Sequence, residues 1–194
     1  MNLTRALIGG LAFSAASVCA AAAQDAPPAP PPKPDVKTVE DWQVRCYPVQ
    51  SAAPCDMLQE QGDQQSGRKI LSISISYVPS MDRHALIVTV PLEVSLAKGV
   101  TVQTDSYTSP TMKYRTCTRD GCFVQTAVDN ALVESVAKST GDGKVNVVGD
   151  DGKTYAIKFS LKGFAQAHDD MVAQAKAKAT KPAQAGAAPT PAQH

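Results

Sequence analysis

The alternating stretch "ILSISISY", residues 70–77, decides the fold class of this chain. Large apolar side chains recur at every second position from Leu71 to Tyr77, and serines fill the positions between them. Because successive side chains of a strand point to opposite faces, this period of two predicts a β-strand with one buried and one solvated face.

A second alternating stretch, "TYAIKFSL" at residues 154–161, follows "VNVVGDDGK" at 145–153. The Asp-Gly pair between them is a typical turn, so the two segments predict a late β-hairpin. Shorter strands are predicted at residues 42–45, 85–90, 100–104, 112–116 and 122–128. Roughly seven short strands favour a mainly β domain, an antiparallel sandwich or a barrel-like sheet.

Two helices are also predicted, one short and internal, the other C-terminal. Asp129 is placed to cap the first, and Gly141 marks its end region. The second begins near Gly163. The apolar residues at helical spacing are Leu132, Val133, Val136 and Ala137 in the first helix, and Phe164, Ala167, Met171, Val172 and Ala175 in the second. An amphipathic helix beside a sheet normally covers it, so we expect both stripes to be packing faces.

The two ends of the chain differ from this β-rich region in composition. Residues 1–23 combine Arg5, an apolar run too short to span a bilayer, and closing alanines, which is typical of a cleaved signal peptide. Residues 24–37 are proline-rich and predict a disordered spacer, and residues 179–194 predict a disordered Ala/Pro-rich tail. The folded domain is therefore expected at residues 38–178.

A signal peptide predicts export to the periplasm or cell envelope. Loss of Arg5 leaves 18 basic and 18 acidic residues, so the exported chain lacks the basic surplus of nucleic-acid-binding proteins. No second segment is long and apolar enough to span a membrane. We expect no transmembrane segment in the mature chain, although it can associate peripherally with the envelope.

Four cysteines, Cys46, Cys55, Cys117 and Cys122, remain after the signal, which would remove Cys19. In an oxidising compartment an even number favours disulfides. Cys117 and Cys122 flank "TRDG", whose Asp-Gly pair suits a hairpin turn, and facing residues of such a hairpin lie within disulfide range. This predicts the bonds Cys117–Cys122 and Cys46–Cys55.

Two other uses of the cysteines are less consistent with their spacing. A structural zinc site needs four convergent ligands, usually with cysteines two to four residues apart, and Cys46 and Cys55 are more widely spaced. A redox pair needs two residues between its thiols at a helix start, whereas Cys117 and Cys122 have four in a β context. We therefore predict no metal ligand and no redox centre.

Other catalytic patterns are missing from the sequence. His84 and His168 belong to no zinc-binding motif, and the chain has neither a phosphate-binding loop nor a nucleophile elbow. The acidic residues near Asp142 and Asp150 lack the ligand spacing of a calcium loop. The sequence predicts no catalytic residue and no cofactor.

Taken in order, several segments resemble the invasion-associated locus B family of exported bacterial proteins. They are "VEDWQVRC", "CDMLQEQ", "VPLEVSLAKGVTVQTD", "YRTCTRDGCFVQTAVDNALVESV" and "FSLKGFAQAHDDM", which together cover most of residues 38–171. The resemblance implies an envelope-associated β-rich domain from a family linked to host-cell invasion, and it carries over no catalytic residue. One departure is Glu93, where the family commonly has glycine.

The leading hypothesis is an exported, non-enzymatic envelope protein that binds an unidentified envelope or host-surface protein. Arg119 and Asp120, at the tip of the predicted hairpin, are the candidate contact residues. The alternative is a periplasmic small-molecule-binding module or an unrecognised hydrolase. A deep pocket with polar groups around His84 or His168 would favour that alternative.

Overall fold

The computed structural model describes residues 32–128 and 130–180 of the 194-residue chain. The predicted signal peptide, the proposed cap at Asp129 and residues 181–194 of the predicted tail lie outside the described residues, as does the spacer through residue 31.

The described residues contain ten strands and two helices. The strands are β1 (Asp35–Val39), β2 (Trp42–Cys46), β3 (Cys55–Gly62), β4 (Lys69–Val78), β5 (Arg83–Val90), β6 (Val100–Gln103), β7 (Tyr114–Thr118), β8 (Gly121–Val128), β9 (Asp142–Val148) and β10 (Thr154–Ser160). The helices are α1 (Asn130–Lys138) and α2 (Phe164–Thr180).

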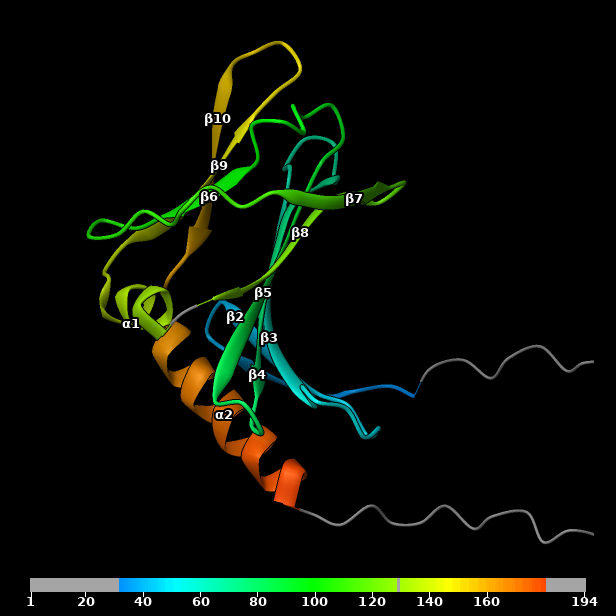
Figure 1. The fold of residues 1–194 in the computed structure, drawn as a ribbon, viewed down its shortest axis with the longest axis vertical. Coiled ribbons are helices and arrows are strands. Elements are labelled where there is room, and N and C mark those ends of the chain that lie inside the picture. The colour runs from blue at the N-terminus through cyan, green and yellow to red at the C-terminus, as the bar shows by residue number, and fades with distance from the viewer. Residues whose placement is uncertain (1–31, 129, 181–194) are drawn as a thin grey trace, which may run out of the picture. The chain divides into compact units, whose positions relative to one another are not determined.

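The strands form two antiparallel sheets (Figure 1). The larger has seven strands in the order β1-β2-β3-β4-β5-β8-β7, and the smaller has three in the order β10-β9-β6. The late hairpin predicted from the Asp-Gly turn is β9–β10, with Val148 opposite Thr154. The expected mainly β antiparallel class is confirmed, and the arrangement is sandwich-like rather than a closed barrel.

The opening stretch forms β4, near the middle of the larger sheet. Its apolar side is buried from Leu71 to Tyr77, as the alternation predicts. The serine side is less solvated than predicted: Ser74 is 9% exposed, and its hydroxyl donates to Asp56 at 2.8 Å. Asp56 on β3 also forms an ion pair with Arg45 on β2, so Ser74 lies under a polar cluster rather than in open solvent.

Both helices bury the stripes that the sequence predicts. Leu132, Val133 and Val136 of α1 join the core, as do Phe164, Ala167, Met171 and Ala175 of α2. Helix α2 packs against β1 to β4 and contacts α1, and Figure 1 shows it beside the β2 to β4 part of the larger sheet. These contacts support the prediction that α2 covers a sheet.

Several element boundaries differ from the predictions. Strands β1 and β3 were not predicted, and β1 begins at Asp35, so the expected start of the domain at residue 38 falls inside a strand. Strand β7 begins at Tyr114 rather than 112, because Met112 bridges to Val100 of β6 instead. Helix α2 extends to Thr180, two residues beyond the expected end of the domain.

Glu93 adopts a left-handed backbone conformation, with φ of 69°. This conformation crowds the Cβ atom and costs a non-glycine residue roughly 1–2 kcal/mol, which explains why glycine suits the position. The surrounding structure holds the turn, because the Glu93 carbonyl accepts a hydrogen bond from the Asp150 amide at 3.0 Å.

Glu93→Gly is therefore expected to raise the free energy of unfolding by up to about 1 kcal/mol, since relief of the strain exceeds the added entropy of the unfolded chain. Urea unfolding measures the change. Glu93→Ala removes the charge and keeps the strained Cβ, so it is the matched control. An equal gain in both variants would show that charge, rather than backbone strain, limits stability here.

Candidate interaction surface

The β7–β8 hairpin turns through the two residues predicted as contacts, Arg119 and Asp120. Thr118 pairs with Gly121 across the turn, and the Asp120 amide donates to the Thr118 hydroxyl at 3.2 Å. Both Arg119 and Asp120 are exposed. The turn therefore presents one cation and one anion side by side to solvent.

Two disulfides brace the larger sheet, with the pairing that the sequence predicts. Cys117 and Cys122 are joined across the hairpin with a Cα–Cα distance of 4.0 Å. Cys46 and Cys55 are joined across β2 and β3 at 4.1 Å and are buried. The first bond lies one residue pair from the tip, so it restrains the presentation of Arg119 and Asp120.

Gly121 fixes the tip against the neighbouring strand. Its φ is 132°, and an added Cβ would lie 2.3 Å from the Val90 carbonyl oxygen. Only glycine fits such a close approach in this conformation. The hairpin tip is therefore packed directly on the end of β5.

Sheet order brings two other segments to the tip. Because the strands are antiparallel, the start of β4, the end of β5 and the start of β8 lie at the same end of the sheet. They surround a hollow of about 330 Å³ lined by Arg68, Lys69, Pro91, Leu92, Arg119, Asp120 and Gly121. We call these seven residues the tip hollow.

Charge in the tip hollow is mostly positive and only partly neutralised. Lys69 forms an ion pair with Glu60 on β3. Arg119 makes no ion pair with any residue that the structure describes. Leu92 is 48% exposed at the same site. The tip hollow thus combines an available guanidinium with an exposed apolar side chain.

The sequence predicts the tip but misses the rest of the hollow. The Asp-Gly pair marks a turn locally. Arg68 and Leu92 lie at the same hollow as Arg119 only because of the strand order of the folded sheet. No spacing or motif around Arg68 or Leu92 signals that convergence.

The two histidines named by the alternative hypothesis are brought together. His84 of β5 and His168 of α2 face each other with their Nε2 atoms 3.0 Å apart. The imidazole of His84 also lies 5.1 Å from the Tyr77 ring, and His168 stacks on Phe164 at 6.3 Å. This histidine pair joins α2 to the larger sheet and is built into their interface.

Burial and the neighbouring imidazole of His168 lower the pKa of His84, a shift opposed by Asn130 and Asp82. A lowered folded-state pKa means that, below the unfolded value near 6.5, the unfolded chain binds protons more readily. The stability that neutral His84 contributes is therefore fully present above that pH, and it is lost as the pH falls toward the folded-state pKa.

We expect the free energy of unfolding to fall between pH 7 and pH 5, by at most about 1.4 kcal/mol per pH unit for one proton. Urea titrations at several pH values measure it. The His84→Gln variant should show a shallower slope, because glutamine cannot take up the proton. Identical slopes would exclude the histidine pair as a source of acid sensitivity.

The histidine pair belongs to no cluster of potential metal ligands among the described residues, and it lies outside two hollows of the molecular surface. Within residues 32–128 and 130–180, no group of three or more His, Cys, Asp or Glu side chains is placed to hold a metal ion. The tip hollow does not include His84 or His168, and neither does a second cavity of about 460 Å³ beside β8.

Sequence comparison places the chain among known proteins. The profile of the invasion associated locus B (IalB) protein family matches residues 42–172. The chain belongs to this family. The matched range runs from the start of β2 into α2 and includes both disulfides and the tip hollow.

Relatives of this IalB family chain agree with that assignment. It is 28% identical over 140 residues to the invasion protein B homologs of Brucella abortus strain 2308 and of biovar 1 strain 9-941, covering 72% of this chain and 80% of each relative. The crystal structure of invasion associated protein B from Bartonella henselae matches with a TM-score of 0.63 at 21% identity, covering 72% of this chain and 96% of that one. This last likeness shows the shared fold.

The names of the family and of these relatives refer to invasion and to no catalysed reaction. Of the two helices in the described part of the chain, neither has the length and apolar character needed to cross a bilayer.

Proposed function

We propose that this IalB family member is an exported, non-enzymatic protein of the periplasm or cell envelope that acts by binding another protein. The partner is an unidentified envelope or host-surface protein, and the tip hollow is the contact site. The observation that carries the proposal is the position of Arg119, at a disulfide-braced turn, exposed and without an ion-pair partner in the described structure.

The chemistry of the tip hollow suggests what it binds. An exposed guanidinium forms strong paired hydrogen bonds with a carboxylate, and Leu92 adds an apolar contact beside it. Arginine and large apolar groups are common anchors of protein interfaces. A partner surface with a carboxylate next to an apolar side chain fits this site.

The alternative of a periplasmic small-molecule-binding module or hydrolase receives less support. His84 and His168 bond to each other within the α2 interface, and the two cavities described above lie elsewhere. Both cavities are open at the surface, whereas ligand pockets usually bury most of their ligand.

Photo-crosslinking in intact cells tests the proposal directly. A crosslinking amino acid at Asp120, which is exposed beside Arg119 and leaves the guanidinium in place, is expected to yield a specific adduct, while the same group at Lys153, in the exposed β9–β10 turn, is the matched control. Arg119→Glu should abolish an adduct formed from Leu92. A Leu92 adduct that persists in Arg119→Glu, or equal adducts from both turns, would contradict the tip hollow as the contact site.

The biological outcome needs its own measurement. Deleting the gene and measuring host-cell entry and envelope integrity side by side is expected to reveal a defect in one of them, restored by the wild-type chain and not by Arg119→Glu. Unchanged phenotypes, together with turnover of a substrate by the purified protein, would overturn the proposal.

A further inference from the structure

The larger sheet has an open edge beside the second cavity. Strand β7 pairs with β8 only as far as Val124, whereas β8 continues to Val128. Residues 125–128 of β8 pair with β5 on one side, and no other described strand or bridge borders them on the other. Four residues of strand edge, about 13 Å long, are left without a neighbour.

The cavity of about 460 Å³ lies along this edge. It is lined by four successive residues of β8, Gln125 to Val128, although successive strand side chains point to opposite faces. Such consecutive lining means that the backbone edge itself forms the wall. We call this cavity, with its lining residues 107, 109–113, 125–128 and 132, the edge groove.

Backbone groups of β8 point into the edge groove. The Cα–Cα distance of 4.0 Å between Cys117 and Cys122 identifies theirs as a narrow, non-hydrogen-bonded pair of the antiparallel ladder. The flanking pairs through Gly121 and Phe123 are therefore the hydrogen-bonded ones. Along the regular β8 strand the same alternation directs the amide and carbonyl of Gln125 and of Ala127 away from β5 and toward the groove.

One of these groups is already partly used. The Ala127 carbonyl accepts a hydrogen bond from the Thr126 hydroxyl at 3.1 Å, and a carbonyl oxygen has a second lone pair. The edge therefore offers two amide donors and two carbonyl acceptors in the spacing of a β-ladder.

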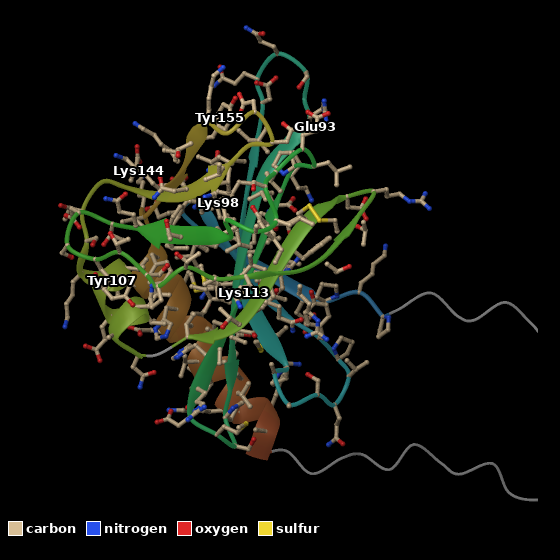
Figure 2. All side chains as sticks on the ribbon, turned by 45° about the horizontal axis from the view of Figure 1, so that its top comes forward. Glu93, Lys98, Tyr107, Lys113, Lys144 and Tyr155 are labelled. Carbon is tan, nitrogen blue, oxygen red and sulfur yellow. A yellow bond between two sulfur atoms is a disulfide. The ribbon has the colours of Figure 1, made fainter. Side chains whose placement is uncertain are left out.

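The opposite wall belongs to the smaller sheet. Residues 109–113 follow β6, to which they are bound through the Ser109 amide and the Met112 amide and carbonyl, each at 2.8–2.9 Å. Figure 2 shows Tyr107 and Lys113 toward opposite ends of this wall. A strand placed in the groove would thus lie between β8 of one sheet and a segment bound to β6 of the other.

Side chains around the groove define the residues that such a strand should carry. Met112, Val128 and Leu132 supply an apolar lining. Lys113 is exposed and forms no ion pair with the residues described, and Arg115 reaches over the same end of β8, where its Nη1 atom donates to Gln125 at 2.9 Å. An acidic side chain at the Lys113 end and apolar side chains along the groove complement this surface.

We propose that the edge groove accepts an extended acidic-apolar segment of a partner protein, which adds to β8 as a strand in line with β7, beyond its first residue Tyr114. This rests on the proposed function, that the chain acts by binding a protein, and it assigns a second contact surface distinct from the tip hollow. Strand addition supplies main-chain hydrogen bonds for affinity and side-chain pockets for specificity.

A linear heptapeptide library displayed on phage, panned against the purified full chain, tests the groove with a defined probe. Enriched peptides are expected to have apolar residues at every second position and an acidic residue near one end. Ala127→Pro removes one groove-facing amide and should weaken a selected peptide by about tenfold or more, from the lost hydrogen bond and the crowding of the proline ring.

Ala156→Pro on β10 is the matched control. The Ser160 amide and carbonyl bond to Gln59 and Trp42 rather than to β9, so alternation directs the Ala156 amide outward as well. This proline lies on another exposed edge and should leave peptide affinity unchanged. Peptides that bind Ala127→Pro as well as wild type, or no enrichment over that variant, would overturn the proposal.

Amide hydrogen exchange gives a second measurement that needs no variant. In the free protein the Gln125 and Ala127 amides should exchange fast, while that of Thr126, bonded to β5, is protected. A saturating selected peptide should slow the first two by about tenfold or more. If their exchange is unchanged, the peptide binds elsewhere and the groove is not its site. A missing crosslink from Asp120 in intact cells would instead count against the tip hollow, so the two failures are distinguishable.

Discussion

Replacing Trp42 with alanine is expected to lower the free energy of unfolding by about 3–5 kcal/mol. Trp42 is fully buried and packs edge-on against Phe164 of α2 at 5.1 Å and Phe159 of β10 at 6.5 Å. Its Nε1 atom also donates to the Ser160 carbonyl at 3.2 Å. One side chain thus joins the larger sheet, the smaller sheet and the last helix.

Circular dichroism during urea unfolding is the appropriate measurement, because the chain has a single tryptophan and the variant loses that fluorophore. Trp42→Phe keeps an aromatic ring and loses the hydrogen bond, so a smaller loss of about 1–2 kcal/mol is expected. Tyr155→Ala, at an aromatic ring that is 47% exposed, should cost less than about 1 kcal/mol. Equal losses at Trp42 and Tyr155 would contradict the central role of Trp42.

The second large effect concerns the buried disulfide. Replacing Cys46 and Cys55 together with alanine should lower the free energy of unfolding by about 2–4 kcal/mol, because the unfolded chain regains the entropy of a closed loop and the core loses packed sulfur atoms. The Cys46 sulfur lies 3.3 Å from the Gln174 side-chain oxygen of α2. We therefore expect faster amide exchange in α2 as well as lower stability.

The hairpin disulfide provides the comparison. The Cys117→Ala, Cys122→Ala double variant opens a shorter loop, of sequence separation 5 rather than 9, at a more exposed site, so its loss should be smaller, about 2 kcal/mol. Amide exchange in α2 should stay as in wild type. A larger loss in the hairpin variant would show that the tip contributes more to the fold than its burial indicates.

Strand β3 shows where sequence patterns stop being informative. Its inward positions are Cys55, Met57 and Gln59, and the glutamine interrupts the apolar alternation that marks β4. Gln59 is nevertheless 4% exposed, because its amide group bonds to the backbone of Ser160, 101 residues away. A polar residue can occupy a core position only when such a partner exists, and no local pattern reveals a partner so distant.

The candidate sites also divide into features that local sequence predicts and features that depend on distant partners. Turn chemistry around Asp120 and cysteine spacing predict a braced hairpin, because the interactions that form it are local. The tip hollow and the edge groove depend on strand order and on where β7 begins, at Tyr114, and these are set by long-range pairing. Met112 illustrates this, since it was predicted in a strand of the hairpin and instead pairs with Val100 of β6.

The contacts of Ser160 with Trp42 and Gln59 also determine the order in which the chain can fold. They close loops of 118 and 101 residues, so the first strands cannot complete their core until the last strand and α2 are available. Such long closures slow folding. A chain synthesised from its amino terminus would keep its aromatic core exposed until the final helix is made, which leaves time for a chaperone to bind it unfolded.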